Sequence, residues 1–157
     1  MAMMQLSEAA AMLGVPFAGT DAEVLRISTD SRSILPGDLF IALRGEKFDG
    51  GAFAAQALQQ GAAGVVLDAA QAPGLAAAIR VDDTRLALGK LAAAWRRRFA
   101  IPVVAITGSN GKTTVKEMLA AILRVETGSD AAVLKTEGNL NNDIGLPLML
   151  LRLRGTH

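Results

Sequence analysis

The sequence has 157 residues, of which 51% are hydrophobic and 20% charged, and its formal net charge is +1. The near-neutral charge argues against binding to nucleic acid or an anionic membrane, and the lack of cysteine excludes disulfides and thiolate metal sites. No signal peptide is recognisable, nor is an apolar run of the roughly 18 residues that a membrane span needs, so we expect a cytoplasmic protein, working as a monomer.

Helices and strands alternate in the amino-terminal half of the sequence. Apolar residues three and four apart predict a helix over residues 6–13, which Gly14 ends. Beyond it, the pattern predicts a helix over residues 52–60 and strands at residues 24–27, 39–43, 64–68 and 78–81. This alternation predicts a small α/β domain, to which we assign residues 1–82.

Two polar loops follow the first two of these strands. Residues 28–32 surround one carboxylate and one guanidinium with small hydroxyl side chains, and residues 44–51 form a long glycine-rich loop. Asp and Ser are ordinary turn residues, and an arginine in such a turn is commonly solvated. The residue types therefore leave two interpretations open, a structural turn and a ligand-binding loop.

A longer helix is predicted to begin the second half. Asp83 can cap a helix over residues 84–99, whose apolar stripe contains Leu88, Leu91 and Trp95. We place a domain boundary in front of this helix and assign residues 83–157 to a second domain.

The strongest motif of the sequence lies between a predicted strand at residues 103–106 and a helical pattern that follows it. The residues between them are Gly108, Ser109, Asn110, Gly111, Lys112, Thr113 and Thr114. In such a loop, glycines let backbone N–H groups turn toward a phosphate, and the start of the helix adds its own N–H groups and positive dipole end. Lys112 would reach the β- and γ-phosphates of ATP, and the Thr113 hydroxyl would ligate Mg²⁺. The usual motif has a further glycine where this sequence has Ile106, so a glycine-rich turn with an exposed lysine is the alternative.

A second polar loop follows a short strand predicted at residues 131–135. The loop spans residues 136–143 and precedes a predicted apolar helix over residues 144–153; its candidate ligand-binding residues are Thr136, Asn139, Asn141 and Asn142. Loops at the carboxyl ends of adjacent strands in an open α/β sheet share one crevice, so this loop and the phosphate loop are expected to face one site. Asn is also a common turn residue, which leaves a structural role open.

The second half has few of the parts that a complete nucleotide-binding domain needs. Two predicted strands are too few for a sheet with helices on both faces, and neither a second carboxylate for Mg²⁺ nor a catalytic base follows the phosphate loop. We therefore expect the second domain to be truncated.

Taken together, these segments resemble the Mur ligase family, the ATP-dependent amide ligases that build the peptidoglycan stem peptide. Residues 107–114 are similar to that family's phosphate loop, which also lacks the early glycine. Residues 28–32, 36–45 and 48–50 are similar to its amino-terminal domain, and residues 139–147 with 150–153 most resemble the members that add the terminal dipeptide. The members that add the third residue are the alternative within the family.

The resemblance implies a fold, a reaction and a set of site residues. The fold is α/β: a small amino-terminal α/β domain that binds UDP, followed by a truncated P-loop-type parallel-sheet domain. The reaction joins D-alanyl-D-alanine to UDP-N-acetylmuramoyl-tripeptide through an acyl phosphate, with ATP and Mg²⁺ at the phosphate loop and Lys112 as the catalytic residue. The substrate would be held by Ser28, Asp30, Ser31, Arg32, Gly45 and Asp49 together with the four candidate residues of the second polar loop. Residues 1–157 alone are expected to be inactive.

Two further hypotheses come from other functional classes. A P-loop kinase or nucleotidase would use the same phosphate loop but transfer the phosphoryl group to a hydroxyl or to water. A non-catalytic module that binds a UDP-sugar would depend on Asp30, Ser31 and Arg32 and not on Lys112.

Overall fold

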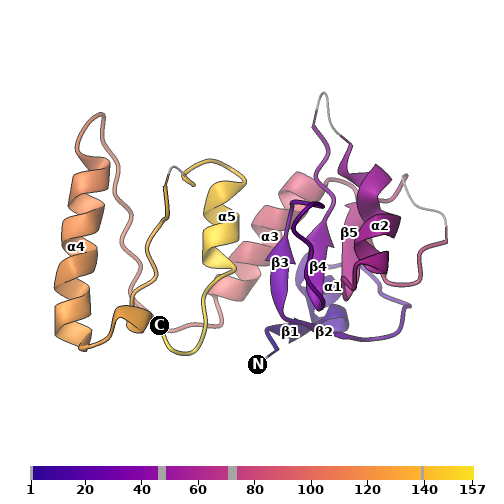
Figure 1. The fold of residues 1–157 in the computed structure, drawn as a ribbon, viewed down its shortest axis with the longest axis horizontal. Helices are drawn as coiled ribbons and strands as arrows, with labels where there is room; N and C mark the ends of the chain where they lie inside the picture. The colour runs from indigo at the N-terminus through magenta and orange to yellow at the C-terminus, as the bar shows by residue number, and fades with distance from the viewer. Residues whose placement is uncertain (1, 46–48, 71–73, 139) are drawn as a thin grey trace.

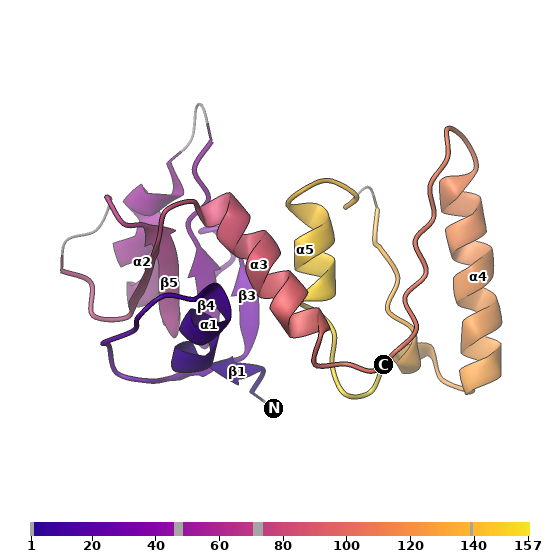
Figure 2. The same cartoon turned by 180° about the vertical axis from the view of Figure 1, so that it is seen from behind.

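The computed structural model describes residues 2–45, 49–70, 74–138 and 140–157 (Figure 1). Its amino-terminal half is built on a parallel four-stranded sheet with the order β3 (Arg26–Ser28), β4 (Asp38–Ile41), β5 (Gly64–Asp68), β6 (Ala78–Val81). Helices α1 (Leu6–Leu13) and α3 (Thr84–Arg96) cover one face, and α2 (Ala54–Gln59) covers the other (Figures 1 and 2). The predicted α/β class with a parallel sheet is confirmed.

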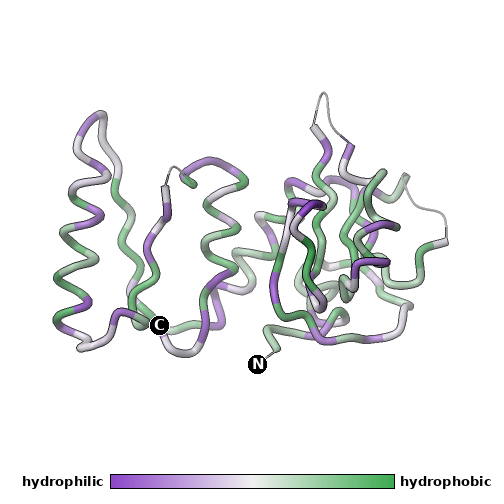
Figure 3. Tube along the Cα trace, viewed as in Figure 1, coloured by the Kyte–Doolittle hydropathy of each residue, from purple (hydrophilic) through white to green (hydrophobic). Residues whose placement is uncertain are grey.

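Alternate residues of the strands supply two separate cores. Leu39 and Ile41 belong to the cluster that includes α1 and α3, whereas Phe40 and Val65 belong to the cluster that includes α2. This division follows from the two-residue period of a strand. Since both faces of the sheet are covered, each of the central strands β4 and β5 carries a buried run of three apolar residues, at 39–41 and 65–67. These strands are mainly green in Figure 3.

The predicted strand at residues 24–27 is divided between two sheets. β2 (Glu23–Val24) pairs antiparallel with β1 (Met4–Gln5), whereas β3 begins at Arg26 in the parallel sheet. The division falls at Leu25, whose N–H donates a hydrogen bond of 2.8 Å to the carbonyl of Gly37. The strands predicted at 64–68 and 78–81 have the predicted bounds, and β4 starts one residue earlier and ends two earlier than the strand predicted at 39–43.

The predicted helices differ from the observed ones at their ends. The helix expected over residues 52–60 begins as a 3₁₀ turn, η1 (Gly50–Phe53), which continues into α2. The helix expected to reach Phe99 ends at Arg96, whose guanidinium donates hydrogen bonds to the carbonyls of Phe99 and Ile101 at 2.7 and 3.0 Å. Asp83 caps α3 as predicted, because its carboxylate accepts from the N–H groups of Arg85 and Leu86.

The second half contains the helices α4 (Lys112–Thr127) and α5 (Gly145–Leu150) and a short 3₁₀ turn, η2 (Asp130–Ala132). The predicted strands at residues 103–106 and 131–135 are not formed, and no described residue after Val81 belongs to a strand. A strand exists only through ladder hydrogen bonds to a neighbour, and these two segments make none. Val103 and Val104 are accordingly more than half exposed. Among the described residues, none of the helices combines the length and apolar character that crossing a bilayer would need.

Helix α3 connects the two halves of the structure. One side of α3 contacts α1, and its other neighbour is α5, which lies beside it in Figures 1 and 2. The indole Nε1 of Trp95 donates a buried hydrogen bond of 3.2 Å to the carbonyl of Leu153, and Leu151 and Leu153 belong to the same core as α1 and the sheet. The domain division at residue 82 stays a prediction, since α3 packs on both halves.

A buried carboxylate fixes the start of the sheet. Asp38 is 1% exposed and accepts from Nε and Nη2 of Arg26, its register partner on β3, at 2.8 and 2.5 Å. The same carboxylate accepts from the N–H of Leu35 at 2.9 Å, and Arg26 also donates to the carbonyl of Ser33. These bonds fasten the turn between β3 and β4, and with it the loop that follows β3.

We expect Asp38→Ala to lower the free energy of unfolding by about 2–3 kcal/mol, because it removes the charge-assisted hydrogen bonds from Arg26 and the acceptor of the Leu35 N–H. Urea denaturation followed by the fluorescence of Trp95, the single tryptophan, measures this. Asp130→Ala is the control, since Asp130 is 90% exposed in its ion pair with Arg124. Equal losses in the two variants would contradict a structural role for the Asp38 carboxylate.

Candidate functional site

The first candidate loop follows the carboxyl end of β3. Ser28 is buried at the end of the strand, and its hydroxyl accepts from the N–H of Asp30 at 3.3 Å. The Asp30 carboxylate accepts from Nε and Nη2 of Arg32 at 2.9 and 2.8 Å and from the Arg32 backbone N–H at 3.0 Å. Ser31 lies between them and is half-buried. Although Arg32 is 88% exposed, its guanidinium is therefore held in one orientation.

Arg32 also changes the ionisation of Asp30. The hydrogen bonds from the Arg32 side chain, and then from its backbone, lower the pKa of Asp30 to about 2. The carboxylate is therefore ionised throughout the physiological range, and the pair presents one negative and one positive group side by side.

The second candidate loop follows the carboxyl end of β4. Arg44 and Asp49 face each other in an isolated antiparallel bridge, and Asp49 accepts from the N–H of Gly51 at 2.9 Å as the cap of η1. Arg44 also donates to Asp68 at the end of β5, at 3.3 Å. Gly45 is exposed at the start of the loop. The predicted residues of this loop thus lie at the same edge of the sheet as residues 28–32.

The phosphate-loop motif lies at the start of α4. Gly111 is the N-cap residue with φ of +77°, and Gly108 has φ of +145°, so both glycines hold a backbone conformation that other residues rarely adopt. The Lys112 ammonium contacts the carbonyl of Gly108 and lies 3.4 Å from that of Ser109. Residues 108–114, which include Asn110, Thr113 and Thr114, are all exposed.

This helix start fits a phosphate group. Because Gly111 has no side chain to cap the helix, no side-chain oxygen of the cap residue accepts from the first N–H groups of α4, and the dipole of this 16-residue helix adds partial positive charge. Thr113 offers one neutral oxygen ligand for Mg²⁺. Among the described residues, no group of three or more His, Asp or Glu side chains could hold a metal ion.

The described residues of the second polar loop, 136–138 and 140–143, make contacts with helices α4 and α5. The Lys116 ammonium on α4 donates to the carbonyl of Thr136 at 2.7 Å, and the exposed Asn141 lies further along the loop. Asn142 accepts through Oδ1 from the N–H groups of Ile144 and Gly145 at 3.3 and 2.6 Å, so its side-chain oxygen caps the start of α5. The predicted ligand residue Asn139 lies outside the described residues.

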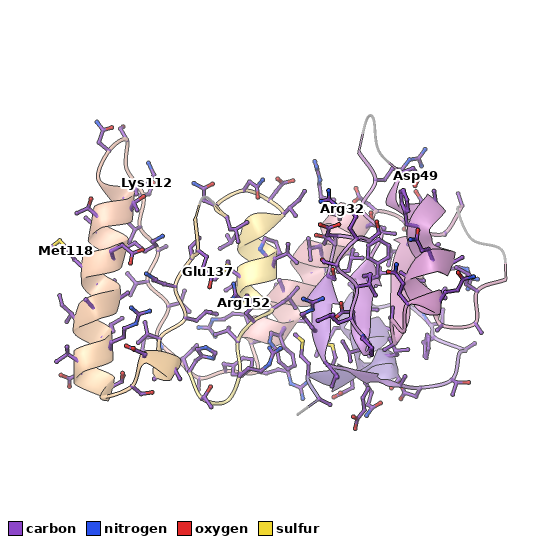
Figure 4. All side chains as sticks on the ribbon, viewed as in Figure 1. Arg32, Asp49, Lys112, Met118, Glu137 and Arg152 are labelled. Carbon is purple, nitrogen blue, oxygen red and sulfur yellow. The ribbon has the colours of Figure 1, made fainter. Side chains whose placement is uncertain are left out.

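Helix α4, which begins at the phosphate loop, also contacts the second polar loop, whereas the expectation that the two loops face one site stays a prediction. Lys116 lies one helical turn after Lys112 and contacts the first residue of the second polar loop. In Figure 4, Lys112, Arg32 and Asp49 all lie toward the upper edge of the molecule. In this view, the phosphate loop lies at one end of that edge and the two amino-terminal loops lie at the other.

A cavity below this edge is lined by none of residues 108–114. Its volume is about 450 Å³, and its wall is mostly apolar, with contributions from Val103, Leu119, Leu134 and Leu150. The cavity lies between α4, α5 and the two segments predicted as strands, residues 103–106 and 131–135. A nucleotide site at the phosphate loop is separate from this cavity.

Sequence comparison covers both halves of the chain. Residues 23–96 match the Mur ligase family catalytic domain, and residues 106–157 match the Mur ligase middle domain. The chain belongs to the Mur ligase family.

Individual Mur ligases are similar over almost the whole chain. It is 46% identical over 149 residues to UDP-N-acetylmuramoyl-tripeptide--D-alanyl-D-alanine ligase of Synechocystis (93% of this chain, 32% of the relative) and 47% identical over 148 residues to that of Escherichia coli (94% and 32%). Among solved structures, a ligase of that type from Acinetobacter baumannii superposes with a TM-score of 0.80 at 43% identity, covering 97% of this chain and 33% of the other. The Thermotoga maritima MurF ligase in complex with ADP gives 0.73 at 35% identity (83% and 30%). The chain spans about a third of the length of these relatives.

Three side chains of this Mur ligase chain make contacts within the second polar loop or to it and were not among the predicted site residues: Lys116, Glu137 and Arg152. Lys116 carries a usable signal, because it lies four residues after Lys112 and so on the same face of the helix. Glu137 and Arg152 form an ion pair of 2.7 Å across 15 positions of the sequence, a separation at which no local pattern predicts contact.

We expect the Asp30 carboxyl to titrate with a midpoint of about 2 in the folded chain. Since the folded pKa is below the ordinary value of 3.8, the stabilisation from this pair is complete above that value and is lost as the pH falls toward the folded pKa. Carbon-detected NMR titration of the side chain measures it. Arg32→Gln should return the midpoint toward 3.8, whereas Arg85→Gln should leave it unchanged; an unshifted midpoint in the unaltered chain would contradict the ion pair.

Proposed function

We propose that these residues are part of a ligase that joins D-alanyl-D-alanine to the tripeptide of a UDP-N-acetylmuramoyl-tripeptide at the expense of ATP. The observation that carries the proposal is the identity of 46–47% to ligases of this name, which extends over both halves of the chain. A 2,6-diaminopimelate-adding relative from Syntrophomonas wolfei is 44% identical over 119 residues (74% of this chain, 24% of the relative), so addition of the third residue is the second candidate.

The phosphate loop would bind the polyphosphate of ATP. The N–H groups at the start of α4 and the Lys112 ammonium would hold the β- and γ-phosphates, which requires Lys112 to leave its present contact with the carbonyl of Gly108. Thr113 would hold Mg²⁺, which when bound would neutralise phosphate charge. These groups position and stabilise charge, which is what phosphoryl transfer chiefly needs.

The reaction would proceed in two transfers. The terminal carboxylate of the tripeptide would attack the γ-phosphorus, the bond to the β-phosphate oxygen would break, and ADP would leave. The amine of D-alanyl-D-alanine would then attack the acyl phosphate, lose a proton and expel inorganic phosphate, leaving the new amide. Lys112 and the first turn of α4 would offset the repulsion between the carboxylate and the polyphosphate.

The amino-terminal loops and the second polar loop would hold the nucleotide-linked substrate. Support for the amino-terminal part comes from the position of both loops at the carboxyl edge of the parallel sheet, where ligands of open α/β sheets bind. The residues we assign to this substrate are Ser28, Asp30, Ser31, Arg32, Gly45, Asp49, Thr136, Asn139, Asn141 and Asn142. For Asn142, the amide nitrogen is the group that would serve, since its oxygen caps α5.

The direct test incubates the complete gene product that carries these residues with Mg-ATP, UDP-N-acetylmuramoyl-tripeptide and D-alanyl-D-alanine, and follows the pentapeptide by mass spectrometry. We expect pentapeptide and one ADP for each amide formed. Lys112→Ala should abolish product and weaken ATP binding by calorimetry at least about tenfold, the effect of losing a hydrogen bond to a charged group. Lys90→Ala, an exposed lysine on α3, is the matched control. A phosphorylated hydroxyl, or ADP without amide, would favour the kinase or nucleotidase hypothesis instead.

A UDP-linked sugar should bind the amino-terminal half without ATP. In NMR spectra, we expect its addition to shift the amide signals of residues 28–32, Gly45 and Asp49, because these loops share one edge of the sheet. Arg32→Gln should reduce these shifts. Arg98→Gln, which alters an exposed residue just beyond the end of α3, should leave them unchanged. Shifts confined to residues 108–114 would contradict the assignment of the UDP-sugar site to the amino-terminal half.

A further inference from the structure

The second polar loop is bound to Arg152 by an ion pair that has no role in the proposed reaction steps. Arg152, just beyond the end of α5, donates from Nη1 and Nη2 to the two carboxylate oxygens of Glu137 at 2.7 and 3.0 Å. Figure 4 shows the two labelled side chains pointing toward each other between the loop and α5. Both oxygens are engaged by one planar guanidinium, so the pair fixes the direction of the Glu137 side chain as well as its distance.

Arg152 is itself held in place. Its Nη1 lies 3.6 Å from the sulfur of Met149, which is buried, and the neighbouring residues Leu151 and Leu153 lie in the core beside α3. Arg152 therefore extends from a segment that is packed on both sides. A loop residue bound to it inherits that fixed position.

The pair contributes little to overall stability. The Arg152 and Glu137 side chains are 50% and 59% exposed, and solvent-exposed ion pairs have small effects on the free energy of unfolding. The pair constrains the loop locally. Glu137 directly follows Thr136, whose carbonyl accepts from Lys116. The carbonyl of Glu137 accepts from the N–H of Leu140 at 3.2 Å. The first half of the loop is thus tied to α4 on one side and to α5 on the other.

The second half of the loop is fixed independently. Asn142 caps α5, Asp143 lies 3.4 Å from Arg85 on α3, and a side chain at Gly145 would meet the backbone of Leu140 at 2.6 Å. The exposed Asn141 therefore lies between Glu137, which Arg152 holds, and Asn142, which caps α5. Releasing Glu137 removes the first of these contacts and leaves the second in place.

We propose that the bidentate Arg152–Glu137 ion pair is a positioning device that holds the loop residues Gly138, Leu140 and Asn141 against the nucleotide-linked substrate, so that Arg152 acts on binding of that substrate without contacting it. This inference rests on the proposed ligase function, because it assigns the second polar loop to the peptide-bearing substrate. It predicts an effect on one substrate and not on the other, since Lys112 and the start of α4 do not depend on the pair.

The test uses Glu137→Gln and Arg152→Gln in the complete gene product. Each should raise the KM for UDP-N-acetylmuramoyl-tripeptide, with kcat/KM falling about tenfold to a hundredfold as expected for a misplaced binding group, while the KM for Mg-ATP stays unchanged. The exchanged double variant Glu137→Arg with Arg152→Glu should recover most of the loss. Glu8→Gln, which breaks the exposed Glu8–Arg98 pair on the amino-terminal half, should change neither KM.

Hydrogen exchange gives a readout that does not require activity. In either single variant the amides of residues 137–141 should exchange faster, whereas those of α4 should keep their rates. Unchanged KM for the tripeptide substrate, equal changes in both KM values, or no recovery in the double variant would each overturn the proposal. If the unaltered protein formed no amide, the ligase function would fail, and unchanged exchange in residues 137–141 would then separately overturn the anchoring role.

Discussion

The packing of α3 between the amino-terminal sheet and α5 is the contact on which the arrangement of the candidate loops depends. Trp95 lies at this junction: its ring meets Phe99 edge to face with centroids 5.3 Å apart, Arg98 lies over it at 5.2 Å, and its Nε1 donates to the carbonyl of Leu153. A buried donor and acceptor that satisfy one another are costly to separate. Because Leu153 lies three residues beyond the end of α5, this bond also helps to set where α5 places the second polar loop relative to the loops of the sheet.

Much of the amino-terminal fold could be predicted from local sequence, because its apolar strands pair with one another. Prediction failed in the second half, where apolar segments have no partner strand among the described residues. The strand at residues 64–68 has a continuous apolar run, and the strand at residues 78–81 is apolar except for Arg80. Both find partners on the same sheet, so pattern and structure agree. Residues 103–106 have a similar run and form no strand. The apolar pattern describes what a strand could bury, whereas the ladder depends on a partner elsewhere, which no local signal contains.

In the candidate site, too, the residue types could be predicted from the sequence, whereas the contacts between distant residues could not. The glycines and Lys112 of the phosphate loop could be identified because the chemistry needs those types at that spacing beside a helix start. Asp38 is a buried carboxylate whose partner Arg26 comes from the neighbouring strand, a contact that no local pattern predicts. The Arg152–Glu137 pair is equally non-local. In each case the side chain was visible in the sequence and its partner was set by tertiary packing.

The cationic side chains at the candidate edge already have acceptors, and this shapes how an anionic ligand would bind there. Arg32 is paired with Asp30, Arg44 with Asp68, and Lys112 with the carbonyl of Gly108. A ligand phosphate must therefore exchange one partner for another, so the gain in free energy is the difference between two interactions and not the whole of the new one. Such exchange favours a ligand whose shape satisfies several of these groups at once over free phosphate. A chain with a net charge of +1 can in this way bind polyanions through placement of donors without a basic surface.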